Sequence, residues 1–372
     1  MSLAIQTVST VQPDSPILQR WQDQIRTARA EEKALVITGA GSKSFYGLPI
    51  EGEALDTRDY RGIIDYEPTE LVMTARCGTP LSEIEATLAA SGQMLAFEPP
   101  RFGGTPTIGG VVAAGLSGPR RMAAGAVRDF VLGVRLMTGT GDLMRFGGQV
   151  MKNVAGYDVS RMLTGSLGCF GVVAEVSLKV VPTLHQETTL QFEVTERGAL
   201  ANLNRWAGQP LPISGSLWLD GKLSVRLSGA EPAVAAARRK LGGEALVDNS
   251  LAEAFWAGVR DQSHSFFAED SSALIRLSLP DTSAPIPRSE QQLIEWGGAQ
   301  RWYRADIGQL QQFCDLAANA GGHATLFRAP KGHRTNKAFT PLSKPLLRIH
   351  RALKQSFDPA GVFNRGRMYP EF

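Results

Sequence analysis

Apolar residues recur at helical and then at strand spacing near the start of the chain. Residues 16–31 carry one apolar face at helical spacing, made by Ile17, Leu18, Trp21 and Ile25. The apolar run at 34–38 predicts a short buried strand that leads into the glycine turn GAGSK at 39–43. A second helical stripe starts after Pro80 and closes at Gly92. The pattern predicts mixed helix and strand structure, with a glycine loop at the end of the first strand.

The pattern changes at Pro182, where strands alternate with helices and glycine becomes less frequent. The segment LWLDGKLSVRLSG predicts a hairpin that turns at Asp220 and Gly221. Three more strands are expected in ALIRLSLP, AQRWYRAD and GHATLFRA, and helices around 231–240, 286–294 and 307–319. The tail from 341 predicts a helix followed by the turn-rich DPAGVFNRGRM, and no internal repeat is visible. These elements predict a second α+β domain.

Composition narrows the class of protein. A chain of 372 residues exceeds what one hydrophobic core usually supports, so at least two domains are expected. The 39 basic and 36 acidic residues are too evenly balanced for nucleic acid to be an expected partner. Cys77, Cys169 and Cys314 stand far apart, which predicts no disulfide framework, no metal or iron–sulfur site in this chain, and a reducing cytoplasm. No export signal or transmembrane segment is expected.

Three glycine-rich stretches carry the candidate chemistry. The first, GAGSK, allows positive φ at Gly39 and Gly41 and so turns successive N–H groups toward an anion. A purely structural turn at the strand end is an equal alternative. The second stretch is PPRFGGTPTIGGVVAAGLSGPRRMAAG at 99–125, and the third is NVAGYDVSRMLTGSLGCFGVVAEVSLKVVP at 153–182.

The third stretch places Gly165, Gly168 and Gly171 at three-residue intervals, directly before a β-branched run. Backbone without side chains can lie close against an extended dinucleotide, which needs many N–H donors. The alternative is tight packing between a loop and a strand. Both hypotheses stay open at this point.

In this order and with these separations, the three stretches resemble the FAD-binding domain of the p-cresol methylhydroxylase/vanillyl-alcohol oxidase (PCMH-type) flavoprotein family. TIGGVVAAGLSGPRR, VMKNVAGYDVSRMLTGSLGCFGVV and FDPAGVFNRGRM are most similar to the FAD-binding subunits of bacterial glycolate oxidases, also called glycolate dehydrogenases. The resemblance implies an α+β fold with a two-lobed PCMH-type FAD-binding domain at 1–182. It also implies a second, ferredoxin-like α+β cap domain at 183–325, and a C-terminal segment at 326–372 that returns to the flavin domain.

The resemblance further implies which residues hold FAD. The pyrophosphate is expected against Gly39, Ala40, Gly41, Ser42 and Lys43. The phosphates and flavin are expected along Thr107, Ile108, Gly109, Gly110 and Ala113, with Ser117 following. The adenosine side is expected at Gly165, Ser166, Gly168, Gly171, Val172 and Val173. Asn364 matches an asparagine near the isoalloxazine ring, although a turn-capping role is its alternative. No histidine lies between 95 and 130, so the FAD is expected to be noncovalent.

The catalytic residues are not identified by the sequence. Oxidation of a small 2-hydroxy acid needs a base, a cation for the carboxylate, and hydride transfer to flavin. The family's catalytic members carry histidine-rich strands in the second domain, whereas this chain has no H-x-H pair. His323, Arg276 and Arg301 are weak candidates, each with a structural role as its alternative.

The resemblance implies a complex in which electrons from glycolate oxidation pass through flavin to an iron–sulfur subunit, together with a related flavoprotein subunit. A self-sufficient hydroxy-acid dehydrogenase, acting on a substrate such as D-lactate, and a non-catalytic scaffold are the alternatives. Between Arg328 and Arg367 there are ten basic residues and one acid, Asp358, which predicts either a docking surface or a solvated helix face. The expected location is cytoplasmic, or peripheral at the inner membrane through partners.

Overall fold

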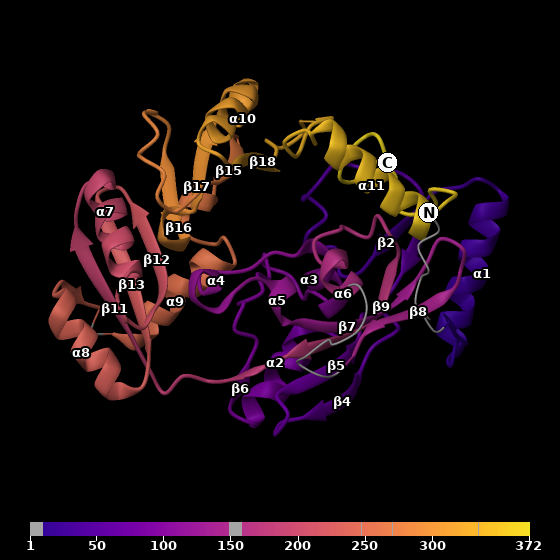
Figure 1. Ribbon diagram of the computed structural model, residues 1–372, viewed down its shortest axis with the longest axis horizontal. Helices are drawn as coiled ribbons and strands as arrows, with labels where there is room; N and C mark the ends of the chain where they lie inside the picture. Colours follow the sequence, from indigo (N-terminus) through magenta and orange to yellow (C-terminus); the bar gives the residue numbers. More distant parts are fainter. Residues whose placement is uncertain (1–9, 149–157, 247, 270, 334) are drawn as a thin grey trace.

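Two large sheets organise the chain. The computed structural model describes residues 10–148, 158–246, 248–269, 271–333 and 335–372. A six-stranded sheet has the order β1-β8-β7-β9-β5-β4, and an eight-stranded sheet has the order β14-β11-β13-β12-β16-β17-β15-β18. In Figure 1 the eight-stranded sheet lies at the left and the six-stranded sheet at the lower centre. Helices accompany both sheets, so the expected α+β class is confirmed.

The six-stranded sheet is antiparallel and buried on both faces. Its strands are β1 (Thr10–Val11), β8 (Leu143–Gly147), β7 (Val131–Met137), β9 (Val172–Lys179), β5 (Val72–Arg76) and β4 (Ile63–Glu67). One core packs them against α2 (Leu81–Ala90), α3 (Ile108–Ala114), α5 (Val127–Phe130) and α6 (Val159–Leu163). A second core packs them against α1 (Pro16–Ala30). Val172 and Ala174 of β9 enter the second core, whereas Val173, Val176 and Leu178 enter the first.

Helix α1 forms as its sequence predicts. Ser15 caps its N-terminus by accepting a hydrogen bond from the Leu18 N–H, and Pro16 occupies the first turn, where no donor is needed. Its apolar face buries Trp21 and Ile25 against a small parallel pair, β2 (Leu35–Thr38) and β3 (Glu53–Asp56). The first glycine turn begins where β2 ends.

The first half of the eight-stranded sheet follows the β-α-β-β-α-β order of ferredoxin-like units. Its elements are β11 (Gln186–Glu193), α7 (Glu196–Ala207), β12 (Ile213–Leu219), β13 (Lys222–Gly229), α8 (Glu231–Leu241) and β14 (Glu244–Ala245). Asp220 and Gly221 form the predicted hairpin turn with φ of 48° and 82°. Positive φ at both central residues is what a two-residue hairpin favours.

The second half repeats this topology without its first helix. It comprises β15 (Ala273–Ser278), β16 (Gln292–Glu295), β17 (Gln300–Ala305), α10 (Leu310–Asn319) and β18 (His323–Arg328). The halves are mirrored in strand order and joined by β12 and β16. The helix expected around 286–294 was wrong, because β16 occupies part of that segment. The repeat is one of topology, which the residue pattern did not reveal.

A buried arginine supports the segment that replaces the missing helix. Residues 279–291 contain three prolines, each of which lacks the N–H that a helix interior needs. The fully buried Arg301 donates to the carbonyl oxygens of Ser283, Ala284 and Gly298 at 2.5, 2.7 and 3.2 Å. Arg301 alternates with Trp302 along β17 and so lies on the face that packs against α10.

A cluster of ion pairs connects the loops beside the six-stranded sheet to the eight-stranded sheet. Glu98, from the loop after β6 (Gln93–Met94), accepts from the Arg226 guanidinium at 2.9 Å and from the Arg120 backbone N–H at 2.7 Å. Arg226 lies on β13, and Arg120 also pairs with Glu187 on β11. The loop before α4 (Arg121–Ala124) is thereby fixed to the eight-stranded sheet.

The remaining elements are short or connect the sheets. They are β10 (Val181–Pro182), α9 (Asn249–Arg260), η1 (Ser265–Phe267), η2 (Trp296–Gly298), η3 (Ile307–Gln309) and α11 (Lys344–Phe357). Beyond α11 the chain returns to the first lobe, where Phe363 bridges to Leu35 in parallel with β2. Figure 1 shows α11 above the six-stranded sheet.

The Arg301 arrangement makes a stability prediction. We expect Arg301→Met to lower the free energy of unfolding by about 3 kcal/mol, because buried carbonyl groups lose their donor. Urea unfolding followed by circular dichroism measures the change. Arg205→Met, at an exposed site on α7, should change stability by less than about 0.5 kcal/mol. Equal stabilities of the two variants would contradict this role.

Candidate functional site

The three glycine stretches meet in one region. A methyl group added at Gly39 would lie 2.7 Å from the Thr107 hydroxyl, which places the first stretch against the second. Gly115, at the end of α3, is so close to the third stretch that an added methyl group would lie 2.8 Å from Gly165. The fold therefore brings together residues separated by more than a hundred positions.

The first loop forms a cradle of unused donors. Within the part of the chain that the structure describes, the backbone N–H groups of Ala40, Gly41, Ser42 and Lys43 donate to no protein group. Gly41 has φ of 74°, and a side chain there would meet nothing within 4 Å. Successive free N–H groups around a left-handed residue form an anion-binding concavity. This geometry favours the ligand hypothesis over a purely structural turn.

Lys43 adds a cation to this cradle. Its Nζ lies 5.5 Å from the centre of the Phe102 ring and 3.3 Å from the Ser42 hydroxyl oxygen. It forms no ion pair with any carboxylate among the described residues. Burial lowers its pKa to about 8. The nearby charge of Asp261 acts in the opposite direction and raises the pKa. A partly desolvated cation with no direct ion pair, beside free N–H donors, suits a phosphate group.

The N-terminus of α3 serves mainly to hold the second loop. The N–H groups of Ile108 and Gly109 donate to Thr79 and Cys77 carbonyl oxygens at 2.9 and 2.8 Å. A side chain at Gly109 would lie 2.6 Å from the Cys77 Cβ, so glycine is needed for packing. The Gly110 N–H reaches the Thr107 hydroxyl at 3.4 Å. These predicted site residues position the loop rather than present free donors.

Ala113 and Ser117 also make contacts that order the loops. The Ala113 carbonyl oxygen accepts from the Leu167 N–H at 2.9 Å, which ties α3 to the third loop. The Ser117 hydroxyl accepts from the Val127 N–H at 3.2 Å. Both residues are only half-buried, so each also retains exposed surface near the loops.

The glycines of the third loop differ in whether they support ligand contact or tight packing between a loop and a strand. Gly165 has φ of 82°, and an added methyl group would lie 4.0 Å from the Ala114 carbonyl oxygen and from Gly115 Cα, so its positive φ rather than a collision favours glycine. Added methyl groups at Gly168 and Gly171 would lie 2.7 Å from the Asn364 amide and from the Met137 carbonyl oxygen respectively. Those two glycines permit tight packing. Val172 and Val173 are buried β9 residues in the two cores, and Ser166 is also buried.

Asn364 joins the first and third loops. Its side-chain oxygen accepts from the Ile37 N–H at 2.9 Å, and its amide donates to the Leu167 carbonyl oxygen at 2.6 Å. Ile37 lies on β2, immediately before the GAGSK turn. Both polar ends of the side chain are therefore used to position the two loops.

A buried cation anchors the segment that carries Asn364. The Lys354 ammonium donates to the carbonyl oxygens of Cys169 and Phe363 and to the Asp358 carboxylate at 2.7 to 2.8 Å. Asp358 also accepts from the N–H groups of Val362 and Phe363, each at 2.8 Å. Sequence reasoning missed this pair, although lysine and aspartate four residues apart at a helix end is a visible signal.

The catalytic candidates separate onto two faces of the eight-stranded sheet. Arg276 faces the loops, where its Nη2 donates to the Tyr46 hydroxyl at 3.0 Å and its Nε has no partner. His323 begins β18 with an exposed side chain. Arg301 lies on the opposite face and is occupied by backbone carbonyl groups, so this geometry does not support its role toward a substrate carboxylate.

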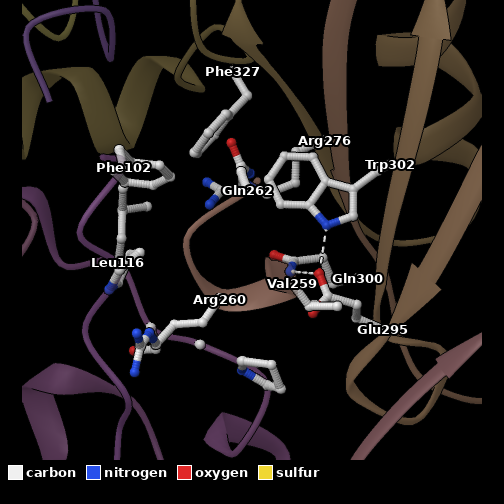
Figure 2. A pocket seen from close by; sticks show the side chains of 14 residues that line it. Phe102, Leu116, Val259, Arg260, Gln262, Arg276, Glu295, Gln300, Trp302 and Phe327 are labelled. Atoms are coloured by element: carbon white, nitrogen blue, oxygen red, sulfur yellow. Dashed lines mark hydrogen bonds between the residues drawn. The ribbon is translucent and has the colours of Figure 1, made fainter. Parts of the chain in front are cut away.

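A small cavity lies between the second loop and the eight-stranded sheet (Figure 2). Phe102 and Leu116 line one side, and Arg276, Trp302 and Phe327 line the other. Its volume is 20 Å³, which admits one or two water molecules. Trp302 and Phe327 pack against each other in its wall, with ring centres 4.8 Å apart.

Glu295 is a buried carboxyl group at this cavity. Its Oε2 accepts from Trp302 Nε1 at 2.6 Å and from Gln300 Nε2 at 3.0 Å. Burial raises the pKa of Glu295 to about 7, against the lowering effect of those hydrogen bonds. Sequence reasoning missed it, because its burial depends on pairing between distant strands. Figure 2 shows both donors directed at the carboxylate.

Two of the three cysteines are buried, and the described residues form no metal-ion cluster. Burial raises the thiol pKa to about 12 for Cys77 and to about 11 for Cys169, which keeps both thiols protonated and poorly nucleophilic. Within the described residues no group of three or more histidine, cysteine or acidic side chains is placed to hold a metal ion. Of the helices described, none has the length and apolarity to cross a membrane.

The cradle of free N–H groups and the unpaired Lys43 fit the pyrophosphate of a flavin dinucleotide. A family described as "FAD binding domain" matches residues 13–147. The expected relationship to flavoproteins is confirmed, and the chain belongs to a class of FAD-dependent oxidoreductases.

The particular family is shown by a curated relative. Glycolate oxidase subunit GlcE of Escherichia coli is 49% identical over 349 residues, covering 94% of this chain and 96% of that protein. The chain belongs to the GlcE family. The resemblance to FAD-binding subunits of bacterial glycolate oxidases is thereby confirmed.

More distant relatives match less of the chain. Glycolate oxidase subunit GlcD of Bacillus subtilis is 30% identical over 48% of this chain and 39% of its own length. D-lactate dehydrogenase of Archaeoglobus fulgidus is 26% identical over 45% of this chain and 40% of its own length. A solved alkyldihydroxyacetonephosphate synthase structure shares the fold, with a TM-score of 0.64 and 15% identity over 94% of this chain and 75% of that one.

Lys43 gives the site a predicted pH dependence. Because its pKa is lowered to about 8, raising the pH through 8 removes its positive charge and weakens FAD binding. We expect Lys43→Met to weaken binding about tenfold at pH 7 and to flatten the dependence between pH 7 and 9. Fluorescence titration of flavin-stripped protein measures both effects. Lys240→Met, at an exposed site on α8, is the control, and equal affinities of the two variants would contradict the role.

Lys354 gives a second prediction. We expect Lys354→Met to reduce the bound flavin per chain and to lower the free energy of unfolding by about 3–5 kcal/mol, because Asp358 is left buried and unpaired. Lys354→Met with Asp358→Asn should recover part of the loss. Lys344→Met, at an exposed site on the same helix, is the control. If Lys354→Met matches that control in flavin content and unfolding, the anchor is not needed.

Proposed function

We propose that this chain is the FAD-binding subunit of a multi-subunit glycolate oxidase that passes electrons to an iron–sulfur partner subunit. The observation that supports it most is 49% identity to GlcE over nearly the whole of both chains. The relative is named as a subunit, which suggests that this chain also works with others. A related flavoprotein subunit is the second proposed partner.

FAD would supply two-electron chemistry, and the residues of this chain would hold it noncovalently. The free N–H groups at 40–43 and Lys43 would bind the pyrophosphate, and Gly165 would allow backbone to approach the ligand. The other predicted binding residues would order these loops. We propose 1–182 as the FAD-binding domain, 183–325 as the cap domain, and 326–372 as the returning segment. The eight-stranded sheet spans β11 to β18, from Gln186 to Arg328, close to those limits.

One observation favours electron relay or assembly over self-sufficient catalysis. The cavity at the candidate Arg276 has a volume of 20 Å³, which is too small for a 2-hydroxy acid, whereas clefts of 400 to 530 Å³ lie elsewhere on the chain. Arg276 is already engaged with Tyr46, and no described histidine lines this cavity. We therefore assign glycolate oxidation to the assembled complex. We predict that this complex is cytoplasmic or peripheral at the inner membrane.

Anaerobic spectroscopy tests this proposal. The purified chain should show flavin absorbance, dithionite should reduce the flavin, and glycolate or D-lactate alone should leave it oxidised. Adding glycolate after reconstitution with the flavoprotein and iron–sulfur subunits should bleach it. A chain that stays colourless with added FAD supports the scaffold, and rapid reduction by a hydroxy acid without partners supports the self-sufficient dehydrogenase.

A further inference from the structure

The outer face of α11 carries a stripe of cations. Lys344, Arg348 and Arg351 recur at spacings of four and three residues and are all exposed. Arg365, in the turn after the helix, is exposed as well. None of the four forms an ion pair with a carboxylate in the described parts of the chain. We call these four residues the basic surface.

Exposed apolar side chains also occur on α11, and a groove adjoins the basic surface. Ile349 and Leu346 are 51% and 47% exposed, although both are large aliphatic residues. On one side, Arg351 and Arg365 line a groove of 510 Å³. Its wall also contains Lys354, Phe372 and two acids, Asp358 and Glu371. A concave, cationic surface with an apolar edge has the features of a protein docking site.

The inner face of the same helix holds the proposed flavin site. Lys354 donates to the Cys169 carbonyl oxygen in the third loop, and Leu353 and Phe357 pack against the core of the six-stranded sheet. One helix therefore has the flavin loop on one side and the basic surface on the other. A protein bound at the basic surface would contact a helix that also contacts the third loop.

We propose that the basic surface docks an acidic face of the electron-accepting subunit. This inference rests on the proposed function. Unpaired cations complement an acidic protein, and the groove can receive a protruding segment of it. An anionic lipid surface is the alternative occupant, because Leu346 and Ile349 are exposed on the same helix, and vesicle binding distinguishes the two.

Charge reversal in the co-expressed complex tests the inference. The variant is Lys344→Glu with Arg348→Glu and Arg351→Glu. The control is Arg238→Glu with Arg239→Glu and Lys240→Glu, which makes the same charge change at exposed positions on α8. We expect the α11 variant to recover at least about tenfold less iron–sulfur subunit at low salt, while the control matches wild type. High salt should reduce recovery by the wild type.

Flavin content separates this test from the proposed function. The α11 variant should keep the flavin content of wild type, because Lys354 is retained. Equal recovery by the two variants overturns the docking site even if both bind FAD. The docking site is also overturned if the α11 variant loses binding to phosphatidylglycerol vesicles but recovers as much iron–sulfur subunit as wild type. It is likewise overturned if light scattering shows a homodimer that only the α11 variant abolishes. A wild-type chain without flavin would instead overturn the proposed function.

Discussion

The structure depends on one buried ammonium group and the oxygens around it. The Lys354 ammonium donates hydrogen bonds to a carboxylate and to two backbone carbonyl groups. These acceptors stabilise its charge although the side chain is almost wholly buried. These bonds join a helix near the chain end to a loop some 185 residues earlier. The turn that follows then delivers Asn364 between β2 and the third loop. Without this contact, the loops would lack their shared support.

Glycine has two separate uses in the proposed flavin site. At Gly109, Gly168 and Gly171 a side chain would collide with neighbouring protein atoms, so the missing side chain lets the loops approach one another. At Gly41 the space beside the backbone is open, and at both Gly41 and Gly165 a positive φ turns the chain. The second use depends on the first, because open backbone binds a ligand only when neighbouring segments hold it in place.

Local patterns predicted the local structure well. Helix α1, the hairpin at Asp220 and Gly221, and α10 follow directly from spacing and turn chemistry. The motif order also predicted the family. The helix expected at 286–294 failed because prolines and the distant Arg301 determine that segment. The sequence did not predict the buried Glu295 either. Pairing between strands that are distant in the chain buries this residue, and a local residue pattern contains no information on such pairing.

The continuous ladder through β12 and β16 has a mechanical consequence. Two ferredoxin-like halves that share backbone hydrogen bonds form one stiff plate, so neither half can swing alone. A wider opening between the eight-stranded sheet and the glycine loops would then move the sheet as a unit. The Glu98 ion pairs lie where such a movement would hinge or be resisted. A subunit that contacts both the eight-stranded sheet and the glycine loops would oppose such a movement.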